Sequence, residues 1–218
     1  VWDTANPGSK LASVFPTTEE TSHVAVPGEG KKAARLESKE VASMGILAAG
    51  NIYTGKFVSI AGKGAKLDWG VPFTSRPLAM KGYFDYKPEI INKYFAKKPE
   101  MEGKVDICQI QVFLTDWETQ FRINTKESTF VDVENDPNII AYGKLESNVN
   151  TSTKDNLVNG YEPFTIKLDY RDLTRKPTMI VIVAAASKYG DYFTGGIGST
   201  LYLDEFSFVY NPSELDAE

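Results

Sequence analysis

The chain has 218 residues, which suits one large all-β domain or two small ones, and 42% are hydrophobic, enough for a core without disulfides or metal. Its formal net charge is −5, and because no basic stripe runs along it, the sequence argues against nucleic-acid binding. No apolar run approaches the roughly 20 residues of a membrane span, and the single cysteine, Cys108, excludes an intrachain disulfide.

Short alternating segments bounded by turn residues predict β-strands over 33–38, 55–62 and 78–88. The third has two faces, with Leu78, Met80, Phe84 and Tyr86 on one and Lys81, Tyr83 and Asp85 on the other. The segment 105–114 has the same period, with Cys108, Ile110, Val112 and Leu114 on one face and Gln109 and Gln111 on the opposite one. Two amides in register indicate a face that meets water or a polar ligand, whereas Cys108 reads as a small buried hydrophobe.

The C-terminal half continues the pattern of alternation. Phe164, Ile166, Leu168 and Tyr170 point inward along 162–172. The segment 178–187 is apolar on both faces, which predicts a central strand covered on both sides, and its alanines 184–186 leave room nearby. A three-residue step from Leu203 to Phe206 breaks the period of two and predicts a β-bulge near Asp204–Glu205.

Eight or so strands without long helical periodicity, repeats or a domain boundary predict an all-β fold. We expect a two-sheet antiparallel β-sandwich of jelly-roll type, like that of carbohydrate-binding modules, formed by residues 1–218 as a single domain. The chain starts "VWDTANPGS" without Met, so we expect a processed or truncated chain from which any targeting segment is missing.

The loop 187–200 is the first candidate binding segment. Tyr189 and Tyr192 flank Asp191, and several glycines allow close backbone approach. A pyranose offers an apolar C–H face to aromatic rings and hydroxyls to carboxylates or amides, so this mixture suits a sugar. The alternative is a tight connection whose tyrosines only cover the end of the sandwich.

Two further stretches combine aromatic and charged side chains. The segment 67–88 contains Trp69, Arg76 and Tyr83, and the segment 114–125 contains Trp117 and Arg122. The favoured alternative for Arg76 is an arginine paired with the chain's own acids, and Trp117 could equally cap the core. The predicted ligand-binding residues are Trp69, Arg76, Tyr83, Gln109, Gln111, Trp117, Arg122, Tyr189, Asp191 and Tyr192. We expect the rings of Trp69, Tyr83, Trp117 and Tyr192 to converge around one water-filled hollow.

The acids give weaker evidence of catalysis. Asp132, Glu134 and Asp136 alternate, which in a strand places three carboxylates on one face, as in sandwich glycosidases, but neighbouring Asn and Pro residues favour a solvated turn. An oxygen-rich turn of this kind could alternatively hold structural calcium, although no EF-hand loop is present. His23 is the only histidine and has no acid close in sequence. Because zinc spacing, a P-loop and a dinucleotide fingerprint are lacking, we predict no cofactor and no metal.

Four stretches carry a family resemblance, namely "WGVPFTSRPLAMKGYFDYKP", "IIAYGKL", "PFTIKLDYRD" and "SKYGDYFTGGIGSTLYLDEFSFVY". Together they resemble the putative carbohydrate metabolism domain (PCMD) family of Bacteroidetes, in order and over nearly the whole chain. The resemblance implies an extracytoplasmic protein, at the cell surface, attached to the outer membrane or in the periplasm. It also implies that an immunoglobulin-like domain and a signal segment precede this jelly-roll portion. No catalytic residue transfers from the family, but Arg76, Tyr83, Tyr86, Tyr189, Asp191 and Phe193 fall on its motif stretches.

Three functions follow, in order of preference. The first is a noncatalytic glycan-binding domain of a cell-envelope protein, with a polysaccharide or oligosaccharide as its partner. The second is a glycoside hydrolase or lyase with two carboxylates among Asp68, Asp116, Asp132, Glu134, Asp191 and Glu205, roughly 5–10 Å apart across one cleft. The third is an adhesion or assembly domain that binds another protein through a flat aromatic patch. Whether the chain is an enzyme is left open by its sequence.

Overall fold

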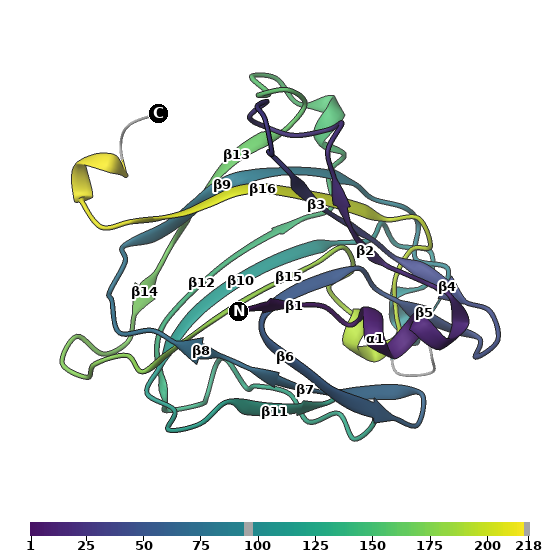
Figure 1. Cartoon of the computed structure of the whole chain (residues 1–218), viewed down its shortest axis with the longest axis horizontal. Helices are drawn as coiled ribbons and strands as arrows, with labels where there is room; N and C mark the ends of the chain where they lie inside the picture. Colours follow the sequence, from purple (N-terminus) through teal and green to yellow (C-terminus); the bar gives the residue numbers. More distant parts are fainter. Residues whose placement is uncertain (94–97, 216–218) are drawn as a thin grey trace.

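The computed structural model describes residues 1–93 and 98–215, which form two antiparallel sheets packed face to face (Figure 1). The larger sheet has the order β11 (Phe121–Asn124), β7 (Gly64–Trp69), β6 (Asn51–Ala61), β15 (Met179–Ala185), β10 (Cys108–Thr115), β12 (Ile139–Ser147) and β14 (Asp169–Tyr170). β1 (Trp2–Asp3) pairs with β6, and β8 (Val71–Pro72) pairs with β15. The smaller sheet has the order β13 (Glu162–Lys167), β9 (Ala79–Lys87), β16 (Thr200–Val209), β3 (Ala33–Glu37) and β2 (Thr17–Glu20).

Short elements fill the connections. β4 (Lys39–Val41) and β5 (Ile46–Ala48) form a separate hairpin. The helical turns are α1 (Asn6–Ser9) and the 3₁₀ segments η1 (Lys10–Ala12), η2 (Pro99–Met101), η3 (Thr151–Thr153), η4 (Gly190–Tyr192) and η5 (Pro212–Glu214). The predicted all-β, two-sheet antiparallel sandwich is confirmed.

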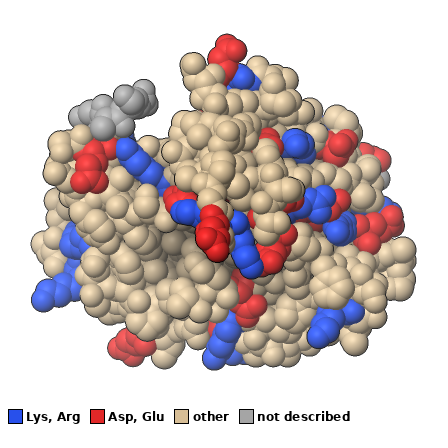
Figure 2. All heavy atoms as spheres, turned by 45° about the horizontal axis from the view of Figure 1, so that its top comes forward, with Lys and Arg blue, Asp and Glu red and all other residues tan. Residues whose placement is uncertain are grey.

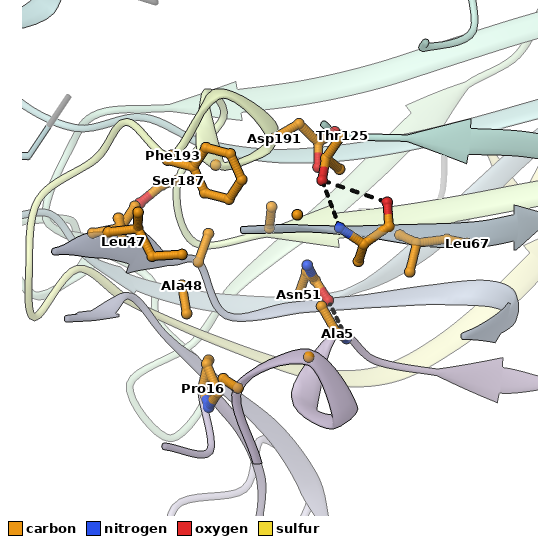
Figure 3. Close-up of a pocket in the computed structure, with 18 of the residues that line it drawn as sticks. Ala5, Pro16, Leu47, Ala48, Asn51, Leu67, Thr125, Ser187, Asp191 and Phe193 are labelled. Atoms are coloured by element: carbon orange, nitrogen blue, oxygen red, sulfur yellow. Dashed lines mark hydrogen bonds between the residues drawn. The ribbon is translucent and has the colours of Figure 1, made fainter. Parts of the chain in front are cut away.

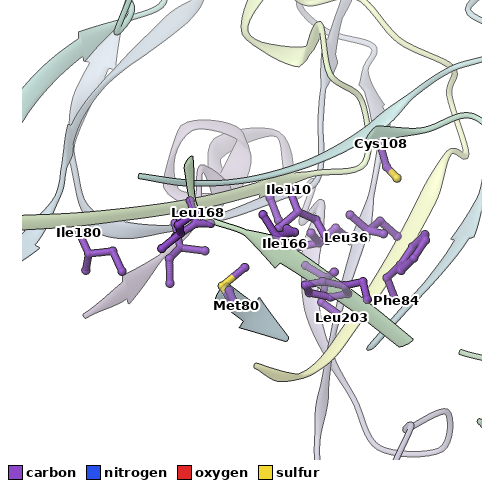
Figure 4. Packing of buried hydrophobic residues seen from close by; sticks show 14 of the residues in the cluster. Leu36, Met80, Phe84, Cys108, Ile110, Ile166, Leu168, Ile180 and Leu203 are labelled. Atoms are coloured by element: carbon purple, nitrogen blue, oxygen red, sulfur yellow. The ribbon is translucent and has the colours of Figure 1, made fainter. Parts of the chain in front are cut away.

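The main core lies between the two sheets (Figure 4). The faces predicted from alternation meet there, since β9 contributes Met80, Phe84 and Tyr86, and β10 contributes Cys108, Ile110, Val112 and Leu114. Phe164, Ile166 and Leu168 come from β13 and the residue after it, and Cys108 is a free, fully buried thiol. Burying apolar surface here is the main source of stability, at about 25 cal/mol per Å².

β15 is the central strand that the sequence predicts. It lies between β6 and β10, and Ile180 and Ile182 face the core between the sheets. Val181 and Val183 face the other way and belong to a second cluster on the outward side of the larger sheet. Because both faces of β15 are covered, alternation of polar and apolar residues is absent from it.

The second cluster exists because one edge of the larger sheet curls back over its own outward face. Residues 51–53 of β6 pair with β15, whereas residues 55–61 pair only with β7. The ribbon of β6, β7 and β11 therefore leaves the sheet and runs beneath it (Figure 1). This outer cluster consists of Tyr53, Leu67, Trp69, Phe113, Trp117, Ile123, Ile139, Val181 and Val183.

The predicted β-bulge is confirmed. The register of β16 against β9 shifts between Asp204 and Ser207, and Glu205 has φ = 51°, in the left-handed region. The bulge leaves the Asp204 carboxylate buried, where it accepts a hydrogen bond from the Ala25 backbone N–H at 2.8 Å.

The surface carries both charge signs. Figure 2 shows acidic and basic side chains interspersed over one face, without an extended basic area. Within the part of the chain that the structure describes, no helix is long and apolar enough to cross a membrane.

Candidate functional site

A pocket of about 120 Å³ lies between the outward face of the larger sheet and the elements that cover it (Figure 3). Its floor comes from three neighbouring strands in register, since Tyr53 pairs with Val183, Val183 with Gln111, and Gln109 with Ala185. β5, β7 and the loop after β15 form the walls, which are mainly apolar. They include Leu47, Ala48, Leu67, Trp69, Asp191 and Phe193.

Small residues make the space. Ala185 occupies the floor at the end of β15, where a larger side chain would fill the pocket, while Ala184 and Ala186 face the core between the sheets. Gly190 lies against Ala49, because a Cβ placed on Gly190 would stand 2.4 Å from the Ala49 Cβ. The room predicted beside the alanines is therefore real, and Ala185 is the one that lines it.

The polar part of the floor is a chain of hydrogen-bonded side chains. The Gln111 amide donates to Gln109 Oε1, and Gln109 Nε2 donates to Glu146 Oε1 at 2.6 Å. The Tyr142 hydroxyl donates to Gln111 Oε1 at 2.9 Å, and Lys188 Nζ lies 2.9 Å from Glu146 Oε2. Burial opposes the ionisation of Glu146, but hydrogen bonds from Lys188 and its neighbours outweigh it and lower the pKa. The amides are thus held in fixed orientations.

Asp191 is the exception to this pattern of mutual hydrogen bonding. Its side chain is half-buried and lines the pocket (Figure 3), yet it forms no hydrogen bond or ion pair with any residue in 1–93 or 98–215. Burial raises the pKa of the carboxyl from its ordinary value of 3.8 to about 6, with no charged neighbour contributing. A carboxylate in this state has all its acceptor capacity available to a ligand.

A second carboxylate, Asp106, fixes the loop that carries Asp191. Asp106 is fully buried, and its Oδ2 accepts hydrogen bonds from the Ser187 hydroxyl at 2.5 Å and the Gly196 N–H at 2.7 Å. These two donors stand at opposite ends of the loop. The Ser187 hydroxyl also shares a 2.6 Å hydrogen bond with that of Ser38. Burial raises the pKa of Asp106, against the effect of these hydrogen bonds.

Comparison with known proteins decides the family. The family model described as "Putative carbohydrate metabolism domain" (PCMD) matches residues 1–209. The chain belongs to the PCMD family. It is therefore a carbohydrate-related domain.

Solved structures show the same fold as this PCMD member. One is described as a putative glycoside hydrolase from Bacteroides thetaiotaomicron; it is 22% identical, with a TM-score of 0.72. The match covers 96% of this chain but 63% of the length of that hydrolase chain. Another, described as a putative glycoside hydrolase from Bacteroides vulgatus, is 21% identical, with a TM-score of 0.67, covering 96% of this chain and 85% of that one. A complex of TmCBM61 with β-1,4-galactotriose covers 97% of this chain and 88% of that one, but at 8% identity and a TM-score of 0.37 it carries no argument. No curated protein matches the chain.

Of the ten predicted ligand-binding residues, the PCMD pocket brings four together: Trp69, Gln109, Gln111 and Asp191. Tyr189 and Tyr192 share a loop with Asp191 but line no part of this pocket. Instead, Lys98 Nζ lies 5.8 Å from the ring centroid of Tyr189 and 5.2 Å from that of Tyr192. Tyr192 also packs on Phe130, at 5.1 Å between ring centroids.

The arginines among the ten are occupied by the protein itself. Arg76 donates to the backbone oxygens of Arg175 and Asp172 at 2.6 and 3.0 Å, and it stacks 4.6 Å above the Tyr170 ring. Arg122 forms a two-pronged ion pair with Asp68 across the β7–β11 ladder. Both therefore tie together neighbouring segments, Arg122 through an acidic side chain and Arg76 through backbone oxygens.

The expected convergence of four rings on one hollow is not found. Trp69 and Trp117 share the outer cluster, but Trp117 is buried and donates its indole N–H to Asp136 at 3.2 Å. Tyr83 packs against a small cluster on the outer face of the smaller sheet, and Tyr192 lies against Phe130. Alternation assigned these rings to faces of strands, but it carries no information on which segment covers each face.

The other acids are engaged away from the pocket. Asp68, Asp116 and Glu205 form ion pairs with Arg122, Arg175 and Lys31, respectively. Hydrogen bonds from Asn135 lower the pKa of Asp132, as in the predicted solvated turn. Among the residues that the structure describes, no group of three or more His, Cys, Asp or Glu side chains is placed to hold a metal ion.

His23 has an acidic partner that the sequence does not reveal. Its Nε2 lies 2.9 Å from Asp85 Oδ2, and its ring packs between those of Tyr161 and Tyr202. This pair stands on the smaller sheet, away from the pocket, and ties the segment after β2 to β9.

Three pocket features went unrecognised in the sequence. Tyr53 belongs to the floor, but the predicted strand began at residue 55 and so excluded it. Leu47 lies in a short hairpin whose place against the loop depends on tertiary packing. Asp106 lies inside the predicted strand 105–114, near its start, and an acid beside an apolar run could have signalled a buried anchor.

Proposed function

We propose that this domain binds a glycan noncatalytically in the pocket beneath the Asp191 loop, as part of a cell-envelope protein that captures polysaccharide. Membership of a carbohydrate-related family supports a saccharide as the ligand. The two-sheet sandwich provides a rigid floor, and the loop and the curled ribbon provide walls that adapt it to one ligand.

The observation that carries the proposal is the Asp191 carboxyl, which lines the pocket without a partner in the described chain. Holding a carboxylate half-buried and unpaired costs stability, because it loses part of its hydration shell and gains no hydrogen bonds from the protein in return. Such a cost is offset when a ligand brings donors to it. Sugar hydroxyl groups are donors of this kind, and charge-assisted hydrogen bonds to a carboxylate are about twice as strong as neutral ones.

The remaining lining suits the ring of a sugar. Leu47, Leu67 and Phe193 give apolar surface for the C–H face of a pyranose, and the ordered amides of Gln109 and Gln111 lie on the floor. At about 120 Å³ the pocket has room for several water molecules, which one sugar unit would displace. The rest of a chain would extend into solvent.

The same lining favours binding over hydrolysis. Glycosidases of the usual type need two carboxyl groups about 5–10 Å apart across the scissile bond. Asp191 is the one carboxylate in the lining that the structure describes, and Asp68, Asp116 and Glu205 are held in ion pairs.

Isothermal titration against a panel of oligosaccharides tests the proposal. We expect at least one glycan to bind, with a dissociation constant in the micromolar to millimolar range. Asp191→Asn should weaken that binding about tenfold, which corresponds to about 1.4 kcal/mol. Glu29→Gln, at an exposed carboxylate outside the pocket, is the matched control and should bind like the native protein. Folded native protein that binds no glycan at millimolar concentration would refute the proposal.

A further inference from the structure

The charges around the pocket are distributed unevenly. Besides Asp191, its titratable lining residues are Lys63 in the β6–β7 turn, Lys188 after β15, and Tyr53 on β6. Lys188 is paired with Glu146 at 2.9 Å, and Lys63 Nζ donates to the Met44 carbonyl at 3.1 Å. Neither ammonium group forms an ion pair with Asp191. Burial raises the pKa of Tyr53, so its hydroxyl stays neutral.

The polar groups of the floor have little remaining capacity to select a ligand. Gln111 already accepts from Tyr142 and donates to Gln109, and Gln109 donates to Glu146. These amides therefore determine the shape of the pocket floor and contribute little to the selection of ligands by charge. Asp191 is the one carboxyl group in the described lining, and it forms no hydrogen bond or ion pair with a described residue, so it offers its negative charge to a ligand that enters the pocket.

An unpaired carboxylate beside apolar walls discriminates strongly between a cation and a neutral donor. The attraction between two unit charges is several times stronger in a partly buried site, where the effective dielectric constant is about 20, than in water. A hydroxyl group gains only one charge-assisted hydrogen bond, whereas an ammonium group has charge on both partners. Apolar walls on the other sides of the pocket suit ring carbons.

Resting on the proposed function, we infer that the preferred ligand is an amino sugar whose free ammonium group pairs with Asp191. The ring lies against the walls formed by Leu47, Leu67 and Phe193. An N-acetylated sugar carries no positive charge at the same position and is discriminated against. So is a neutral sugar with a hydroxyl group there.

The pairing has a pH signature. Asp191 must be ionised and the amine protonated, so binding is strongest between the carboxyl pKa of about 6 and the pKa of the amine. Binding therefore weakens as the pH falls from 7 to 5, and it weakens more for an ammonium ligand, which loses its ion pair, than for a hydroxyl ligand, which keeps a neutral hydrogen bond.

The experiment compares three β-1,4-linked trisaccharides by titration calorimetry at 150 mM salt: glucosamine, N-acetylglucosamine and glucose. We expect the glucosamine trimer to bind native protein at least tenfold more tightly than the other two. Asp191→Asn should abolish this preference and the loss of binding between pH 7 and 5. Glu29→Gln removes an exposed carboxylate elsewhere and should retain both.

The outcomes separate this inference from the proposed function. If the neutral or acetylated trimer binds native protein as tightly as glucosamine, the inference is wrong and glycan binding stands. If Asp191→Asn keeps the preference, attraction of a cationic ligand to the net charge of −5 explains it, and the inference is also wrong. If the folded native protein binds none of the three or any glycan of the wider panel, both are overturned. The comparison of ligands on native protein needs no variant to fold.

Discussion

Two carboxyl groups at the same end of the sandwich, those of Asp106 and Asp191, are both at least partly removed from water but differ in their hydrogen bonding. Asp106 is fully buried and accepts hydrogen bonds from the Ile107 and Gly196 N–H groups and the Ser187 hydroxyl. Asp191, on the loop that Asp106 anchors, is half-buried and has no partner in the described chain. Burial raises the pKa of both. The difference teaches that hydrogen bonding, not burial, distinguishes an acid that anchors the loop from an acid whose oxygens stay open to the pocket.

The largest effect that this contrast predicts is on Asp106. Asp106→Ala leaves the Ser187 hydroxyl and the Gly196 N–H buried without their acceptor, and each such group costs about 1–3 kcal/mol. We expect the free energy of unfolding to fall by about 3 kcal/mol or more in urea titrations. Ser187→Ala, which removes one donor and leaves the carboxylate, should cost about 1 kcal/mol. Equal losses in the two variants would contradict the anchoring role.

An intermediate effect is predicted where the loop meets β5 and β6. Gly190→Ala would bring a Cβ to 2.4 Å from that of Ala49, so η4 must move and take Asp191 with it. Overpacking of this kind costs about 1–3 kcal/mol, and glycan affinity should fall with it. Unfolding and titration calorimetry measure the two effects. Gly28→Ala is the control, because its new Cβ would meet only the flexible Lys31 side chain. If Gly190→Ala binds glycan normally, the position of this loop does not matter for binding.

The smallest predicted effect is that a substitution of Asp191 increases the free energy of unfolding, whereas most substitutions lower it. The pKa of Asp191 lies above its ordinary value, so this carboxyl favours the folded state below about pH 4, and that contribution is lost as the pH rises through about 6. A shift from 3.8 to about 6 corresponds to about 3 kcal/mol, which partial exposure reduces. We therefore expect Asp191→Asn to be more stable than native protein by about 1–2 kcal/mol at pH 8 and nearly equal at pH 4.

Chemical denaturation at the two pH values measures this difference. Asp132→Asn is the matched control, because hydrogen bonds from Asn135 lower the pKa of Asp132, so its contribution is present at neutral pH and is lost in acid. Its substitution should destabilise the protein at pH 8. An Asp191→Asn variant that is destabilised at pH 8 would show that the carboxylate has a partner in the native protein.

The sequence predicts the strands and their faces well for a physical reason. A strand between two sheets must alternate, so the inward faces of β9, β10 and β13 are visible in the sequence, as is the double covering of β15. The bulge at Asp204–Glu205 is visible because an extra residue breaks that period. These features depend on neighbours along the chain.

The site is predicted less completely because it depends on neighbours in space. Nothing in the alternation around Arg76 or Arg122 indicates that other segments of the chain accept their hydrogen bonds. The curl that puts β7 and β11 over Phe113 is equally hidden, since residues 55–61 read as an ordinary strand. Asp191 could be singled out because aromatic residues and glycines surround it, but its lack of a partner among the described residues could not be predicted.

The curled ribbon of β6, β7 and β11 has a consequence for how such domains diversify. One side of the pocket belongs to this appendage, whose contacts are separate from the core between the two sheets. Mutations between residues 56 and 67 can therefore widen or narrow the pocket entrance, because the stability of the fold depends mainly on other strands. Evolution can thus change which ligands the pocket admits while the core between the two sheets stays unaltered.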